Sequence, residues 1–169
     1  MRRLALFLAS LLTLASCQQT PPDYAMPPMA IAPPGNIREI CFAGPDLATL
    51  HAAMLRTELL VATLHCTNAD GSRSFDRPRD AFFQKFKVEL EANVSGLDAL
   101  AAQRHASHDV WVTEMAGRAS QYTAFDRDFC SRHKRVFDWA LSAPVKSLAQ
   151  VPPPYDLGPE MNLWPCPAP

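Results

Sequence analysis

GPDLATLHAAMLRTELLVATLHC (residues 44–66) is the segment from which the fold of this 169-residue chain is best predicted. Its apolar residues recur at steps of three and four, which is typical of a helix with one buried face. Gly-Pro-Asp is a suitable helix start, because proline is tolerated in the first turn and aspartate is favourable at the positive end. The apolar positions form two neighbouring stripes, Leu47, Leu50, Met54, Val61 and Leu64 in one and Leu55, Leu59, Ala62 and Cys66 in the other.

Three polar residues, His51, Glu58 and His65, project between these two stripes at about 100° per residue. Glu58 is therefore expected on the inward face, where an isolated charge is costly and must be paired or neutralised. One interpretation makes Glu58 a buried general base and the only catalytic candidate; the favoured one is a structural glutamate bound to a neighbouring cation. The candidate cations are Arg104, His105 and Arg118. Steps of seven residues, about 10 Å each, exclude one shared metal site for the three residues.

Three further helices are predicted from the same kind of spacing. The second begins near residues 76–78, the third follows Ser107 as N-cap, and the fourth starts at the capping-box-like Thr123-x-x-Asp126. Pro144 ends the fourth helix or begins a short fifth one. The expected inward positions are Phe82, Phe86, Leu90, Val94 and Leu97, then Trp111, Met115, Ala119 and Tyr122, and finally Phe125, Phe129, His133, Val136 and Ala140. His133 is interpreted as a core histidine. The predicted fold class is all-α, a small four-helix bundle with or without a short fifth helix.

Four cysteines, Cys41, Cys66, Cys130 and Cys166, fall within or beside the predicted helices. If the domain enters an oxidising compartment, an even number of cysteines indicates two disulfides. Cys41 and Cys66 lie at opposite ends of the first helix, roughly 30 Å apart, and a disulfide needs Cα atoms within about 7 Å. Up-and-down topology favours Cys66–Cys130 with Cys41–Cys166, while Cys41–Cys130 with Cys66–Cys166 stays open. The absence of a C-x-x-C pair disfavours a zinc or redox role.

The N-terminal segment has the pattern of an export signal. Arg2 and Arg3 precede an apolar run that is too short to span a bilayer, which takes about 20 residues. The run ends Leu-Ala-Ser-Cys at Cys17, which resembles the lipobox of bacterial lipoproteins. That resemblance implies removal of residues 1–16 and acylation of Cys17 with chains such as palmitate, since stable anchoring takes more than one chain. Gln18, rather than aspartate, favours the outer membrane. An ordinary secretory signal, giving a soluble periplasmic protein, is the alternative.

Two proline-rich segments flank the predicted helical domain. Residues 17–37 carry three Pro-Pro pairs and are predicted to be a lipidated cysteine followed by a polyproline-like linker. Residues 38–150 form the expected helical domain. Residues 151–169 hold seven of the chain's 16 prolines and are expected to form a second Pro-rich segment.

Several kinds of chemistry are disfavoured. The net charge of −1 becomes −3 without Arg2 and Arg3, so no partner among nucleic acids is expected. No glycine-rich phosphate or dinucleotide motif and no G-x-S-x-G motif is present, so no cofactor is predicted. His105 and His108, spaced i, i+3 beside Asp109 at a loop-to-helix junction, are the candidate metal ligands, and a polar loop with an N-terminal helical turn is the favoured interpretation.

Three segments carry a wider resemblance: MLRTELLVATLHC (54–66), FFQKF (82–86) and FCSRHKRVFDWALSAPVKSLAQ (129–150). They are similar to those of a group of small exported four-cysteine helical proteins of alphaproteobacteria, for which no activity is established. The resemblance covers about a hundred residues and places Glu58, Cys66 and Cys130 on motif positions. Some members carry an S-adenosylhomocysteine hydrolase label, which this chain contradicts because it is short and has no dinucleotide motif.

These observations favour a binding or scaffolding lipoprotein, anchored in the membrane through Cys17, facing the periplasm and contacting an envelope protein. An enzyme is disfavoured. The alternative function is a small periplasmic hydrolase or metal-binding protein that uses Glu58 with His105 and His108. A purely structural envelope protein is a third hypothesis.

Overall fold

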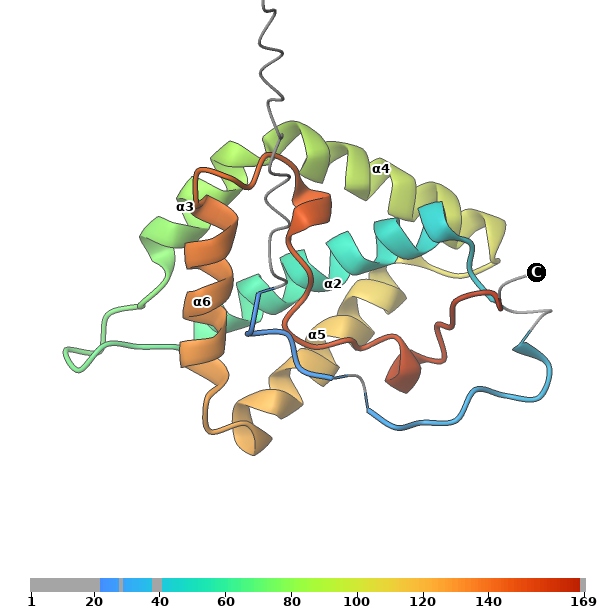
Figure 1. Ribbon diagram of the computed structural model, residues 1–169, viewed down its shortest axis with the longest axis horizontal. Helices are drawn as coiled ribbons and strands as arrows, with labels where there is room; N and C mark the ends of the chain where they lie inside the picture. The colour runs from blue at the N-terminus through green and yellow to red at the C-terminus, as the bar shows by residue number, and fades with distance from the viewer. Residues whose placement is uncertain (1–21, 28, 38–40, 168–169) are drawn as a thin grey trace, which may run out of the picture.

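The computed structural model describes residues 22–27, 29–37 and 41–167 (Figure 1). The signal peptide predicted over residues 1–16 and the lipid site predicted at Cys17 lie outside these residues. Within them the chain forms α2 (Gly44–His65), α3 (Asp76–Lys85), α4 (Lys87–Gln103), α5 (His108–Phe125) and α6 (Phe129–Leu141), followed by the 3₁₀ helices η1 (Leu148–Gln150) and η2 (Pro159–Met161). No strand occurs in this described part, and the predicted all-α class is confirmed.

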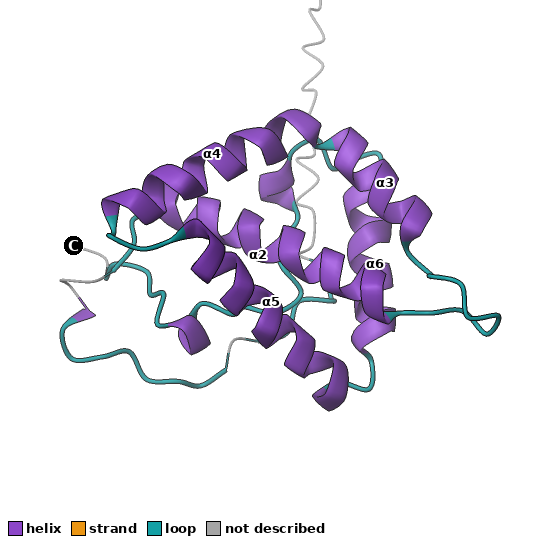
Figure 2. Cartoon of the chain, turned by 180° about the vertical axis from the view of Figure 1, so that it is seen from behind, coloured by secondary structure: helices purple, strands orange, loops and turns teal. Residues whose placement is uncertain are grey.

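Helix α2 is the centre of the fold (Figures 1 and 2), and α4, α5 and α6 all contact it. Leu50, Leu55 and Leu59 are completely buried, as their spacing predicts. Leu64 belongs to the same predicted face but is 63% exposed, because neighbouring elements leave that face open at the C-terminal end of the helix. By length and composition alone α2 could cross a bilayer; here its apolar side chains form the middle of the core.

The second predicted helix is divided in two. Phe86 has φ −108° and ψ 19°, outside helical geometry, and it separates α3 from α4. Its buried ring packs against Phe82, with ring centroids 5.0 Å apart. The break lets α3 pack on α6 while α4 packs on α2, so the two halves of the predicted helix cover different neighbours. For this reason the described residues form five α-helices, α2 to α6, where four are predicted with or without a short fifth after Pro144.

The start predicted for the last helix is also displaced. The Thr123 hydroxyl donates to the carbonyl of Ser120 within α5, and does not cap a new helix. Helix α6 begins at Phe129, with Asp128 at the N-cap position. The Asp126 carboxylate accepts a hydrogen bond from the backbone N–H of Asp128, which forms the tight turn between the two helices.

Both favoured disulfides are present. Cys66 at the end of α2 is bonded to Cys130 in the first turn of α6, with Cα atoms 5.7 Å apart. Cys41, just before α2, is bonded to Cys166 near the C-terminus, with Cα atoms 4.7 Å apart. The prediction from bundle topology is confirmed, and the second disulfide joins residues 125 positions apart in the chain.

The Pro-rich C-terminal segment packs against the helices. We call residues 151–167 the C-terminal strap. Its buried side chains belong to the core: Val151, Tyr155, Leu157, Leu163 and Trp164. Backbone hydrogen bonds from Phe42 to the carbonyl of Trp164, and from Cys166 to the carbonyl of Phe42, fix its end beside the start of α2. In Figure 1 the strap runs across the front of the bundle.

Candidate functional site

Glu58, the one catalytic candidate, is sealed in the core with 0% of its surface exposed. Its Oε2 accepts a hydrogen bond of 3.0 Å from the backbone N–H of Tyr155 in the strap, and its Oε1 has no partner among the described residues. Burial raises the pKa of Glu58 well above its ordinary value; the hydrogen bond from Tyr155 opposes this shift, and the nearby Asp156 and Glu160 add to it. Glu58 is therefore buried as predicted, but its partner is a backbone amide of the strap.

The cations expected near Glu58 have other partners. Arg104 donates to the carbonyl of Cys41 and lies over the ring of Phe42. Arg118 pairs with Glu114, at 2.7 Å, and with Glu160, at 3.5 Å. None of the described cations lies beside Glu58, so desolvation outweighs the single hydrogen bond from Tyr155 and favours the neutral carboxyl.

A polar cluster surrounds Tyr155 and joins the strap to α5 and α6. The Tyr155 hydroxyl donates to Asp126 at 2.7 Å, and Asp126 also pairs with Arg132 at 2.9 Å. The Tyr155 ring stacks on that of Tyr122, with centroids 4.0 Å apart, and the Tyr122 hydroxyl donates to Glu160 at 2.6 Å. These side chains are mutually satisfied, so the cluster holds the strap in place.

His133 is a core histidine, as its position on α6 predicts. It is fully buried, and its Nδ1 lies 2.8 Å from the carbonyl oxygen of Phe129. Burial lowers the pKa of His133 to about 4. This histidine is therefore neutral at physiological pH and contributes to packing against the ring of Tyr155.

The two histidines considered as metal ligands lie at the corner between α4 and α5. His108 pairs with Asp98 of α4, whereas His105 is exposed and adopts a left-handed backbone conformation with φ 52°. Among the described residues no group of three or more His, Cys, Asp or Glu side chains is placed to hold a metal ion. The structure does not bring Glu58 together with His105 and His108.

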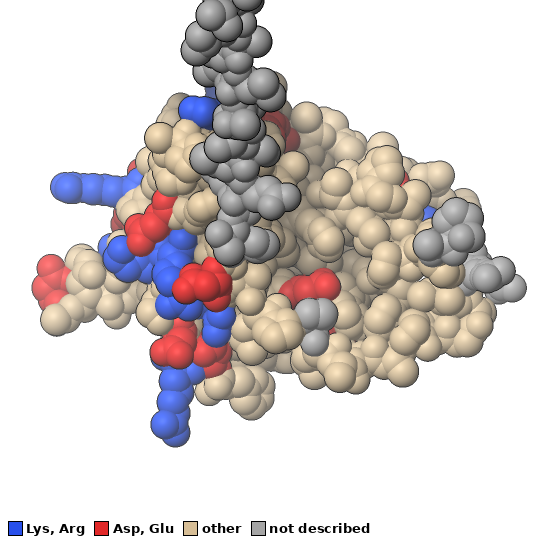
Figure 3. All heavy atoms as spheres, in the orientation of Figure 1, with Lys and Arg blue, Asp and Glu red and all other residues tan. Residues whose placement is uncertain are grey.

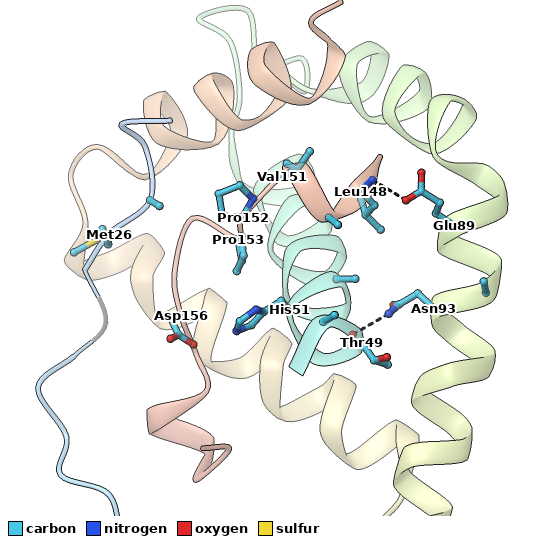
Figure 4. A pocket seen from close by; sticks show the side chains of 15 residues that line it. Met26, Thr49, His51, Glu89, Asn93, Leu148, Val151, Pro152, Pro153 and Asp156 are labelled. Carbon is cyan, nitrogen blue, oxygen red and sulfur yellow. Dashed lines mark hydrogen bonds between the residues drawn. The ribbon is translucent and has the colours of Figure 1, made fainter. Parts of the chain in front are cut away.

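An open groove of about 660 Å³ lies between α2, α4 and the start of the strap (Figure 4). We call it the α2–α4 groove. Small and apolar side chains dominate its walls: Ala25, Met26, Ala48, Ala52, Ala92, Leu148, Ala149, Val151, Pro152 and Pro153. The polar residues that line it are Thr49, His51, Glu89, Asn93 and Asp156. In Figure 4, His51 of α2 and Asp156 of the strap project into the groove from different walls.

The polar groups of the groove are partly engaged in holding its walls. Glu89 of α4 accepts a 2.7 Å hydrogen bond from the backbone N–H of Leu148, which attaches η1 to α4. Asn93 donates from Nδ2 to the carbonyl of Thr49 at 2.8 Å, and its buried Oδ1 has no partner within the described structure. The groove thus combines an apolar surface with two carboxylates and an unused amide oxygen.

Sequence reasoning missed this groove. His51 was noted only as a member of the polar set with Glu58, and Asp156 and Glu89 carry no motif. The three residues come from α2, the strap and α4, and the packing of both α4 and the strap on α2 brings them together. The only sequence signal is the small size of Ala48 and Ala52 on one predicted helix and of Ala92 on another, which leaves space between them.

The fold and this site together define a small all-α, two-disulfide domain with a surface groove closed on one side by its own C-terminal strap. In comparisons with known proteins, no family model, no curated protein and no solved structure matches the chain.

Proposed function

We propose that this protein is a lipid-anchored binding or scaffolding protein of the bacterial envelope, and that the α2–α4 groove receives a segment of a protein partner. The groove is the observation that carries the proposal. Export is supported by the two disulfides, which persist in oxidising compartments such as the periplasm. The anchor is supported by the position of Cys17 after the apolar leader, and Gln18 favours the outer membrane over the inner one.

The chemistry of the groove indicates the kind of segment it binds. Glu89 and Asp156 are its charged residues, and no lysine or arginine is among the described residues that line it. Alanine and proline walls admit apolar side chains closely, and the carboxylates favour a basic group beside them. We therefore expect a partner segment with small or apolar side chains and at least one lysine or arginine.

A charged substitution in the groove tests this proposal. Ala92 is exposed on α4 and lines the groove; Ala92→Arg introduces bulk and a positive charge that opposes a basic segment. Ala99→Arg, at an exposed position of the same helix outside the groove, is the matched control. Purification of the full-length protein from solubilised envelopes under non-reducing conditions should recover a stoichiometric partner with the wild type and with Ala99→Arg.

Ala92→Arg is expected to reduce that recovery at least tenfold, the change that corresponds to about 1.4 kcal/mol of binding free energy. Equal recovery with both variants would show that the partner binds elsewhere. Recovery of no partner in any of several detergents would contradict the binding function. Circular dichroism of both variants checks that the helices are retained.

A further inference from the structure

The N-terminal Pro-rich segment is fixed to the domain at Tyr24. The Tyr24 side chain is 1% exposed, and its hydroxyl donates to the carbonyl of Pro152 at 3.1 Å. Arg132 donates to the carbonyl of Tyr24 at 2.6 Å, and the backbone N–H of Met26 donates to the carbonyl of Pro154 at 2.9 Å. The chain is therefore bound to the strap and to α6 at Tyr24 and Met26.

This attachment shortens the tether between the domain and the proposed lipid. From Cys17 to Tyr24 the chain can extend at most about 25 Å, at 3.3–3.6 Å per residue. A polyproline-like linker over the whole of residues 17–37 would instead reach about 60 Å. A domain anchored through Cys17 and held at Tyr24 therefore stays close to the bilayer surface.

The loop that follows the attachment point has the composition of a lipid-contacting segment. Residues 24–37 contain no Asp, Glu, Lys or Arg, and four of them are prolines, which have no N–H group to desolvate. Three of its apolar side chains face solvent: Met26 is 36%, Met29 53% and Ile31 38% exposed. Figure 3 shows that charged side chains gather on the side of α3 and α6, whereas the surface toward residues 29–37 is largely uncharged apart from a group of acidic side chains near the middle of this face.

We infer that this loop, residues 24–27 and 29–37, lies against the bilayer beside the acylated Cys17, with Met26, Met29 and Ile31 in contact with lipid. The inference rests on the lipid anchor of the proposed function. Exposed apolar side chains on an uncharged surface mark interaction sites, and a bilayer interface accepts such side chains when an anchor holds them there. Because Met26 also lines the α2–α4 groove, the groove opens next to the membrane.

Tryptophan fluorescence with brominated lipids tests the contact. The acylated protein is reconstituted in vesicles of phosphatidylethanolamine and phosphatidylglycerol, with or without bromine on the acyl chains. Met29→Trp places the reporter in the loop. Val88→Trp, at a 77% exposed valine of α4, is the matched control, and the parent protein corrects for the three native tryptophans. Flotation of the vesicles shows, independently, whether the protein is anchored.

The added emission of Met29→Trp is expected to be blue-shifted and largely lost in brominated vesicles, while that of Val88→Trp is retained. Flotation without quenching of Met29→Trp would overturn the membrane contact and leave the anchor intact; a protein partner would then be the occupant of the loop. Equal quenching of both variants would also overturn it. Failure to float would refute the anchor itself, and the contact with it.

A second experiment lengthens the tether between Cys17 and the domain. Inserting about 20 residues of Gly and Ser between Gln19 and Thr20 adds a flexible segment about 25 Å in root-mean-square length and leaves every described contact in place. Flotation should be unchanged, and the loss of Met29→Trp emission should be markedly smaller. An unchanged loss would overturn the short tether as the cause of the contact.

Discussion

Replacing Cys41 and Cys166 together by serine is expected to lower the free energy of unfolding by about 3–5 kcal/mol. The two residues are 125 positions apart, so their bond removes much of the conformational freedom of the unfolded chain. The bond also fixes the end of the strap. Within the strap, the backbone N–H of Tyr155 donates the hydrogen bond to Glu58, and the carbonyl of Trp164 accepts one from the backbone N–H of Phe42, just before α2.

Urea denaturation of the double variant and the wild type, both without reductant, measures this effect. Limited proteolysis should cleave the strap in the variant much faster than in the wild type. The second double variant, Cys66→Ser with Cys130→Ser, serves for comparison; it is expected to lose slightly less, because its bond spans 64 positions. Unchanged stability of the Cys41→Ser and Cys166→Ser protein would show that the strap is held without this disulfide.

Glu58→Gln is expected to stabilise the protein at neutral pH. Between the ordinary pKa of 4.5 in the unfolded chain and the raised pKa in the folded protein, the folded state binds more protons than the unfolded state. The free energy of unfolding of the wild type therefore falls as the pH rises through this window, by about 1.4 kcal/mol per pH unit. Glutamine does not ionise and can still accept the Tyr155 N–H, so the variant escapes this loss.

The measurement is the difference in unfolding free energy between Glu58→Gln and the wild type at several pH values from 4 to 8. We expect a small difference near pH 4, and a growing advantage of the variant above it. His133, whose burial lowers its pKa to about 4, makes both proteins less stable as the pH falls below 6.5, and this contribution cancels in the difference.

Glu91→Gln removes the same charge from an exposed position on α4 and should change the stability by less than about 0.5 kcal/mol throughout. A constant difference between Glu58→Gln and the wild type would contradict a raised pKa for Glu58.

The features predicted correctly from the sequence depend on patterns within a single helix or on the order of helices. The spacing of Leu50, Leu55 and Leu59 identifies the buried face of α2 and puts Glu58 on it. In a bundle whose successive helices run in opposite directions, the end of the first helix lies near the start of the last, so Cys66 can form a disulfide with Cys130. These inferences need only helical periodicity and short connections.

The features that were missed depend on surfaces made by several elements. The prolines of the strap have no periodicity, so the sequence around Tyr155 does not indicate that its ring stacks on Tyr122 and that its hydroxyl donates to Asp126. The break at Phe86 follows from the different neighbours of α3 and α4, which a single helical pattern does not reveal. Tyr24 is buried only because the strap and α6 already offer it a surface and two hydrogen bonds.

Mass spectrometry of the N-terminal peptide of protein isolated from membranes would decide whether Cys17 anchors this domain. We expect the mature chain to begin at Cys17, with the mass of a diacylglyceryl group on its sulfur and, where the organism adds it, a third acyl chain on its amino group. Cys17→Ala should block this processing and leave the disulfides and helices unchanged. A mature protein that starts elsewhere, or that carries an unmodified Cys17 in the soluble fraction, would contradict the anchor and the membrane-facing loop that depends on it.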